Sequence, residues 1–176
     1  HTTIMPGTPY EQSYDNYNTS LEGGKFELKG TDGLKTGSSP TADYNYTATT
    51  KRGKQRIIEV ILGVGNYDVE IAESYRNQIG NTLAEKMFAD YQYKKVLSAG
   101  QHTIDGKTVH LKQDFYATVK KGTNPAIKLE NNRLVVQNGL QQVSPSIKAG
   151  MAVSDSTSTN SSSKQKGLDV MWLFCF

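Results

Sequence analysis

The fold is decided by the stretch TDGLKTGSSPTADYNYTATTKRGKQRIIEVILGVGN, residues 31–66. Its middle part, Ala42 to Lys51, is rich in Tyr and Thr with partial alternation, which is typical of a β-strand. Its last part, Gln55 to Val64, is almost continuously Ile, Val and Leu, which predicts a central strand covered on both faces. Because residues 52–53, Arg-Gly, suit a tight hairpin between these parts, we expect the neighbouring strands to be antiparallel.

The chain before the strand LKTGSS is rich in turn-forming residues. Residues 1–24 mix Pro, Gly, Asn and Tyr with neither a helical nor a strand period, which predicts loops. Residues 25–29 are expected to form a short strand, and residues 31–33 a turn. Two interpretations fit the tyrosines of the first segment: a loop packed on the domain, which is favoured, or a sugar-binding groove. These tyrosines are Tyr10, Tyr14 and Tyr17.

After residue 70 the period changes from that of a strand to that of a helix. Apolar side chains recur every four residues, which predicts an amphipathic helix of roughly five turns whose apolar face covers the sheet. The predicted stripe consists of Tyr75, Ile79, Leu83, Met87 and Tyr91, widened by Ala84 and Phe88. Polar residues such as Arg76 and Asn77 fall off this stripe and are expected to face solvent.

Residues 92–150 have an all-β pattern, and turn pairs separate their short strands. If residues 105–106, Asp-Gly, form a two-residue turn, His102 and His110 face opposite sides of one hairpin, so we expect no metal site there. The only cysteine, Cys175, excludes an internal disulfide and multi-cysteine metal sites. No cofactor is expected.

The last segment, residues 151–176, begins as a Ser/Thr-rich linker that is too polar to fold by itself. It ends in VMWLFCF, which is much shorter than the ~20 residues of a membrane-spanning helix. Three interpretations of this tail stay open: the stump of a membrane anchor, an artefact of a broken reading frame, or a disordered end.

The charge is uneven along the chain. Residues 1–91 carry nine Lys/Arg and twelve Asp/Glu, whereas residues 92–150 carry nine and three. A basic segment of this kind suits an anionic surface such as membrane lipid, wall polymer or nucleic acid, although lysines that merely keep a small β module soluble are the favoured interpretation. The basic run at residues 51–56 is likewise interpreted as a solvated hairpin tip, and we expect no nucleic-acid partner.

The triplet Lys35-Thr36-Gly37 offers chemistry for a peptide that ends in a free carboxylate. On a strand at a sheet edge, Lys35 supplies a positive field and Thr36 a hydroxyl that can bond a carboxylate. Gly37 has no Cβ to hold a substrate backbone away, and the free strand edge can pair with an extended peptide.

In this context the triplet resembles the third conserved motif of a known family. The run from about residue 21 to residue 150 is similar to low-molecular-mass penicillin-binding proteins, the serine D-alanyl-D-alanine carboxypeptidases, and most of all to the staphylococcal penicillin-binding protein 4 type. The resemblance implies an α+β fold: the C-terminal part of a penicillin-binding/β-lactamase-like transpeptidase domain, in antiparallel strands with a covering helix, followed by a small all-β domain.

The resemblance also implies roles for four residues. Lys35 and Ser38 would be catalytic, with Lys35 shaping the field around the nucleophile and Ser38 lending its backbone N–H to the oxyanion hole. Thr36 and Gly37 would bind the substrate. The family's SxxK and SxN motifs belong upstream of this triplet, where nothing fits them. Formal matches at residues 158–160 and 161–164 lie in the Ser/Thr linker and arise from its composition, so we expect this chain alone to be inactive.

The resemblance divides the chain into the end of a transpeptidase domain at residues 1–91, a small β domain at residues 92–150 and the tail at residues 151–176. It implies that the complete protein acts on peptidoglycan stem peptides ending in D-Ala-D-Ala, binds β-lactam antibiotics, and lies at the outer face of the bacterial cytoplasmic membrane or in the wall. A non-catalytic cell-surface binding module stays the alternative. A class A β-lactamase is disfavoured by the β segment at residues 94–150.

Overall fold

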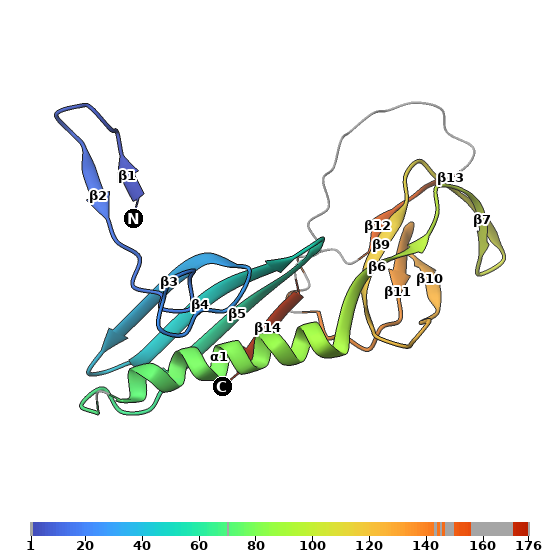
Figure 1. The fold of residues 1–176 in the computed structure, drawn as a ribbon. Coiled ribbons are helices and arrows are strands. Elements are labelled where there is room, and N and C mark those ends of the chain that lie inside the picture. The colour runs from blue at the N-terminus through green and yellow to red at the C-terminus, as the bar shows by residue number, and fades with distance from the viewer. Residues whose placement is uncertain are drawn as a thin grey trace. The chain divides into compact units, whose positions relative to one another are not determined.

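The structure is a computed structural model that describes residues 2–69, 71–142, 144, 146, 150–155 and 171–175. The chain divides into two compact units (Figure 1). Unit 1 comprises His1–Met87 with Met171–Phe176, and unit 2 comprises Phe88–Val170. Each unit packs around its own apolar core.

Unit 1 is built on a four-stranded sheet in the order β14-β5-β4-β3. Strands β3 (Thr31–Ser39), β4 (Asp43–Arg52) and β5 (Gln55–Val64) are antiparallel neighbours, as the sequence predicts. The β4–β5 turn is formed by residues 53–54, one residue later than the predicted pair 52–53, because Arg52 still pairs with Gln55; Gly53 takes a positive φ of 59°. The predicted antiparallel meander is therefore confirmed.

The fourth strand of this sheet comes from the apolar tail. Strand β14 (Met171–Cys175) pairs in parallel with β5, from Met171 opposite Ile57 to Cys175 opposite Ile61. None of the three interpretations of the tail includes such a strand. Among the described residues no helix is long and apolar enough to cross a membrane.

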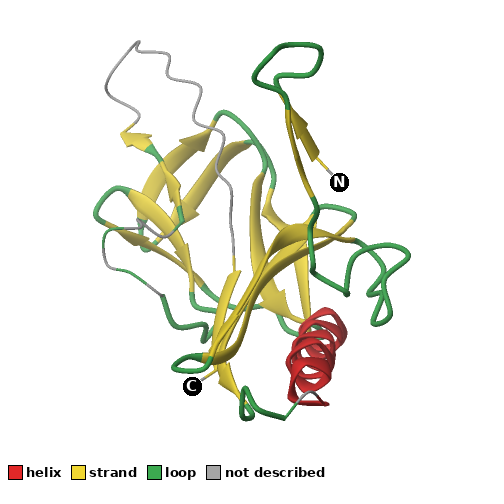
Figure 2. Cartoon of the chain, turned by 90° about the vertical axis from the view of Figure 1, so that its left-hand side faces the viewer, coloured by secondary structure: helices red, strands yellow, loops and turns green. Residues whose placement is uncertain are grey.

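Helix α1 (Ile71–Asp90) lies against one face of the sheet (Figure 2). The predicted stripe is wrong in its first half, because Tyr75 and Ile79 are 47% and 41% exposed. The buried residues of α1 are instead Ala72, Arg76, Asn77, Gly80, Ala84 and Met87, of which only Ala84 and Met87 belong to the predicted stripe. The polar residues among them are buried because the sheet and the N-terminal loop supply hydrogen-bond partners for them.

Strand β5 is not covered on both faces by the described residues. Ile57 and Ile61 are buried on the helix side, whereas Leu62 on the other side is 54% exposed. Ile58 and Val60, which share that side with Leu62, are only half-buried. The prediction that both faces of this strand are covered is therefore wrong for the described residues, although the sequence of the strand is almost continuously apolar.

The segment before β3 departs from its predicted structure in three places. Strands β1 (Thr2–Ile4) and β2 (Gln12–Tyr14) form a hairpin within the segment predicted as loops. Residues 25–29 form turns rather than a strand, since the N–H groups of Phe26 and Leu28 bond to carbonyls of the same loop. Residues 31–33 belong to β3, where a bulge replaces the predicted turn.

The tyrosines of this segment are exposed. Tyr10 and Tyr17 are exposed by more than two thirds and Tyr14 by about half. The favoured interpretation, in which this loop packs on the domain through these rings, is therefore wrong.

Unit 2 is all-β in its described residues after α1. Its strands are β6 (Tyr91–Leu97), β7 (Gly100–Ile104), β8 (Lys107–Leu111), β9 (Phe115–Lys120), β10 (Ile127–Glu130), β11 (Arg133–Val136), β12 (Met151–Ala152) and β13 (Ser154–Asp155). They form the sheets β6-β9, β10-β11-β12 and β13-β8-β7. The core is centred on Val109, Leu111, Phe115 and Leu134.

The predicted hairpin at residues 105–106 is confirmed. Asp105 and Gly106 have φ values of 50° and 74°, and they join β7 to β8. His102 lies opposite Val109 and His110 opposite Gln101, as the two-residue turn requires.

Candidate functional site

The triplet Lys35-Thr36-Gly37 lies in the middle of β3, the last strand on one side of the described sheet. Lys35 is paired with Thr47 and Thr36 with Tyr46 of β4. One edge of β3 is therefore occupied by β4, and the other edge faces away from the sheet.

The backbone N–H and C=O groups of successive β3 residues point alternately to these two edges. Three hydrogen bonds show which residues point to which edge. The carbonyl of Leu34 accepts a bond of 2.7 Å from the side chain of Asn16, and that of Thr36 accepts one of 2.5 Å from the ammonium of Lys35. The carbonyl of Ser39 instead closes the turn to β4. Because groups on alternate residues share an edge, the N–H of Ser38 points away from β4 like the groups of Leu34 and Thr36.

The side chains of the triplet lie on different faces. Thr36 shares the helix-covered face with Tyr46 and is only 8% exposed. Lys35 is exposed and projects from the opposite face, because successive side chains of a strand alternate. Gly37 is also exposed, and a Cβ built there would meet nothing within 4 Å. The described residues thus present the ammonium and the open glycine at the surface, but they do not bring the Thr36 hydroxyl beside them.

Ser38 is tied to the helix by a residue that the sequence pattern did not single out. The guanidinium of Arg76 donates to the Ser38 hydroxyl at 3.3 Å and to the carbonyl of Asn45 at 3.4 Å. It also pairs with Glu73 at 3.0 Å and lies 5.8 Å from the ring centre of Tyr44. Arg76 is 1% exposed, so it anchors the end of β3 from inside the unit.

The sequence contains a signal for the anchoring role of Arg76, although the four-residue spacing of apolar side chains does not by itself pick out this residue. Arg76 is spaced by four residues from Ala72 and from Gly80, and small residues at both neighbours let the helix approach the sheet closely. A Cβ added to Gly80 would lie 2.6 Å from the ring of Tyr46 and 2.9 Å from a carboxylate oxygen of Glu59.

A buried amide network joins the N-terminal loop to the same helix. The amide of Asn77 donates to Ser20 Oγ at 2.9 Å and to Asn18 at 3.3 Å, and Ser20 donates to Asn81 at 2.8 Å. Asn18 also donates to the carbonyl of Gly33 at 3.3 Å. The loop therefore connects α1 to the start of β3 through hydrogen bonds that are shielded from water.

Two titratable groups are buried between the sheet and α1. Glu59 is 1% exposed, and neither carboxylate oxygen has a hydrogen-bond partner among the described residues. Burial raises the pKa of Glu59 to about 8. Burial, with the nearby charge of Glu59, also raises the pKa of Tyr46 to about 12. Near neutral pH the interior of unit 1 thus favours a protonated carboxyl at this position.

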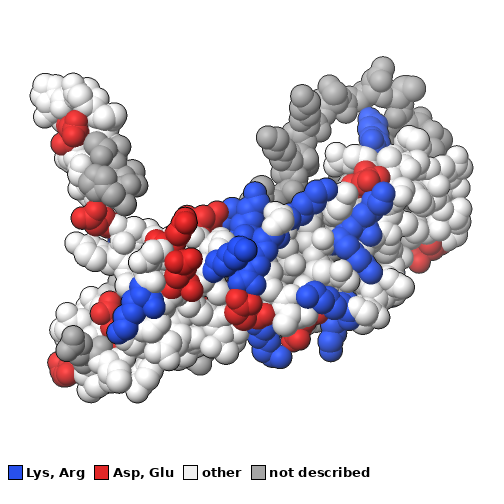
Figure 3. Space-filling model, viewed as in Figure 1, with Lys and Arg blue, Asp and Glu red and all other residues white. Residues whose placement is uncertain are grey.

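The basic run at residues 51–56 is largely paired with acidic side chains. Arg56 forms two hydrogen bonds with Asp32, at 2.7 and 2.8 Å, and Arg52 bonds both carboxylate oxygens of Glu85, at 2.8 and 2.5 Å. These hydrogen bonds lower the pKa values of Asp32 and Glu85. Acidic side chains lie among the basic ones on this part of the surface (Figure 3), so the run is a salt-bridged tip rather than an open phosphate site.

Other candidate sites give little chemistry. A hollow of about 320 Å³ is lined by Thr19, Lys25, Phe26, Ile71, Glu73 and Ser74, and it does not include the triplet. Among the described residues no group of three His, Cys, Asp or Glu side chains could hold a metal ion. The formal SxN and SxxK matches at residues 158–160 and 161–164 lie outside the described residues.

Comparison with known proteins finds one sequence family and several solved structures to which this chain is similar. Residues 93–154 match the sequence family described as "Domain of unknown function (DUF1958)". A peptidoglycan synthesis regulatory factor (PBP3) from Streptococcus pneumoniae is similar with a TM-score of 0.49 and 19% identity over 65% of this chain. The D-alanyl-D-alanine carboxypeptidase DacD from Francisella tularensis is similar with a TM-score of 0.46 and 20% identity over 81%. The chain covers 33% and 38% of these two solved chains.

Proposed function

We propose that this chain is the part of a penicillin-binding protein that carries the Lys-Thr-Gly motif, in an enzyme of D-alanyl-D-alanine carboxypeptidase or transpeptidase type. Residues 1–91 then form the end of the catalytic domain and residues 92–150 a small β domain. The complete enzyme would act at the outer face of the bacterial membrane or in the wall. The proposal also includes the type of enzyme, namely that of staphylococcal penicillin-binding protein 4.

The observation that carries this proposal is the position of the motif on the edge strand β3. An edge strand can pair with an extended peptide, and the N–H of Ser38 is directed to that edge. An N–H at such a position can stabilise the oxyanion that develops during acyl transfer. Lys35, which is exposed beside it, would supply the positive field in the complete site.

The proposal has the Thr36 hydroxyl bind the carboxylate of the substrate. Because Thr36 is buried, the substrate needs a way to reach this hydroxyl. The hydroxyl is on the helix-covered face, so a substrate reaches it only if the strand edge is open at this position in the complete enzyme. The described residues contain no serine within an SxxK motif, so acylation needs a nucleophile supplied from outside them.

Labelling with a fluorescent penicillin tests the proposal. The complete protein that the proposal requires is expressed beside this chain, and a Lys35→Ala variant is compared with a Thr41→Ala variant in the exposed β3–β4 loop. We expect covalent labelling of the complete protein, a loss on the order of 10²-fold in Lys35→Ala, and no loss in the loop variant. Labelling of this chain by itself, or equal labelling in Lys35→Ala, contradicts the proposal.

A further inference from the structure

One face of the β6–β9 sheet in unit 2 combines aromatic rings, hydroxyls and lysines. The register places Tyr91 opposite Lys120 and Lys95 opposite Tyr116. Since side chains alternate, the other face carries the buried residues Phe115, Ala117 and Val119, which belong to the core. The outward side chains, which we term the Tyr–Lys face, are Tyr91, Tyr93, Lys95, Tyr116, Thr118 and Lys120.

The rings of this face are held in place by one another and by the sheet. Tyr93 and Tyr116 stack with their centres 5.6 Å apart and an interplanar angle of 27°. Tyr91 is half-buried, as are both rings of the stack, so each keeps part of its surface accessible. A half-buried tyrosine offers a rigid apolar body and a polar tip, and little conformational entropy is lost when a ligand covers it.

The two lysines differ in their freedom to meet a ligand. Lys95 forms an ion pair of 3.2 Å with Asp114. Lys120 is exposed and has no ion pair among the described residues. It therefore carries the positive charge of the Tyr–Lys face that is available to an anionic group.

We propose that the Tyr–Lys face binds an acidic polysaccharide, with sugar rings lying on the tyrosines and a carboxylate meeting Lys120. Sugar rings present apolar C–H faces together with many hydroxyls, and this face offers matching apolar rings beside tyrosine and threonine hydroxyls. The excess of basic over acidic residues in residues 92–150 adds an attraction for an acidic polymer. This inference does not depend on β3 or on its motif.

Single-stranded nucleic acid is the competing ligand, and the composition of the face disfavours it. Binding of nucleic acid relies on several Lys or Arg contacts to successive phosphates. The Tyr–Lys face has two lysines, of which Lys95 is already paired. It also has no arginine, the side chain best suited to bidentate phosphate recognition.

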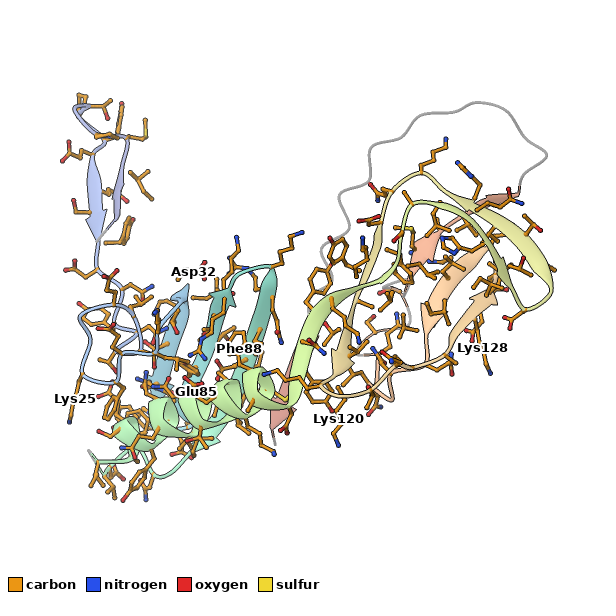
Figure 4. All side chains as sticks on the ribbon, turned by 45° about the vertical axis from the view of Figure 1, so that its right-hand side comes forward. Lys25, Asp32, Glu85, Phe88, Lys120 and Lys128 are labelled. Atoms are coloured by element: carbon orange, nitrogen blue, oxygen red, sulfur yellow. The ribbon has the colours of Figure 1, made fainter. Side chains whose placement is uncertain are left out.

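The test uses the full chain labelled with ¹⁵N and three probes: a hyaluronan hexasaccharide, neutral chitohexaose and a dT12 oligonucleotide. We expect hyaluronan to shift amide resonances in β6 and β9, and to bind several-fold more tightly than chitohexaose. Lys120→Gln should reduce hyaluronan affinity about fivefold, the size expected for one exposed charge pair, while leaving chitohexaose binding unchanged. The matched control is Lys128→Gln, because Lys128 is also exposed but lies on β10 in another sheet (Figure 4).

The aromatic part of the proposal has its own variants. Tyr93→Thr and Tyr116→Thr keep a residue that favours strands, and each should weaken both oligosaccharides by about fivefold or more. If the amide resonances away from the substituted tyrosine keep their dispersion in the ¹⁵N spectrum, the variant is folded. The proposal is overturned if neither oligosaccharide shifts β6 and β9, if dT12 binds more tightly than both, or if a folded tyrosine variant binds like the unchanged chain.

Discussion

Glu59→Gln tests the buried carboxyl beneath α1 most directly. In the folded chain Glu59 titrates at about 8, because burial penalises its charged form, whereas an unburied carboxyl of this kind titrates near 4.5. Between these two pH values the folded state holds a proton that the unfolded state has released. The free energy of unfolding must therefore fall as the pH rises from about 4.5 to about 8, by up to about 5 kcal/mol at ~1.4 kcal/mol for each pKa unit.

The glutamine side chain is nearly the same size and neutral at every pH, so it should remove this slope. We expect Glu59→Gln to be about as stable as the unchanged chain at pH 4.5 and several kcal/mol more stable at pH 9. Tyr46, whose pKa is raised to about 12, stays neutral over this range.

Urea unfolding at a series of pH values measures the effect. Amide resonances of β3, β4 and β5, followed at each urea concentration, report on unit 1. The control is Glu85→Gln, because Glu85 is exposed and its pKa is lowered by Arg52, so its small contribution is lost toward acid pH rather than alkaline pH. Parallel pH profiles for Glu59→Gln and the unchanged chain, or a less stable variant at pH 9, would refute the reasoning.

Three further substitutions probe the packing of unit 1 by the same urea assay. Gly80→Ala should destabilise by about 1–3 kcal/mol despite its better helix propensity, because its Cβ meets the Tyr46 ring at 2.6 Å; a stabilised variant contradicts this. Arg76→Met should cost about 1–3 kcal/mol and alter the amide resonance of Ser38, since the bond to its hydroxyl is lost; an unchanged Ser38 resonance argues against the anchoring role. Asp32→Asn should cost less than about 1 kcal/mol at neutral pH, and this cost should shrink as the pH falls below the ordinary value of 3.8 toward the lowered pKa of Asp32; a larger loss contradicts a solvent-screened pair.

Local sequence signals predicted the elements that depend on local physics. The apolar run of β5 has the bounds that the sequence indicates, and Asp105-Gly106 forms the expected hairpin because both residues tolerate a positive φ. The position of the candidate motif on a strand could also be predicted, since turns and hairpins delimit β3. These features need no knowledge of distant contacts.

The errors concern features that depend on distant partners. The helical period placed Arg76 and Asn77 outside the buried stripe. It carries no information about hydrogen-bond partners on distant segments, which here are Ser38 for Arg76 and Asn18 and Ser20 for Asn77. It could not locate β14 either, since a parallel pairing with β5 is set by the tertiary fold. The burial of Thr36 follows from the same helix packing, so the accessibility of the site could not be read from the triplet alone.

The pairing of β14 with β5 has a consequence for synthesis on the ribosome. Ile57 and Met171 become neighbours although they are roughly 110 residues apart in the chain. At ~5–20 residues per second, the outer edge of β5 stays without its partner for about 6 to 20 s while unit 2 is translated. During that interval a nascent chain exposes an apolar strand edge, which makes it a natural client for a holding chaperone.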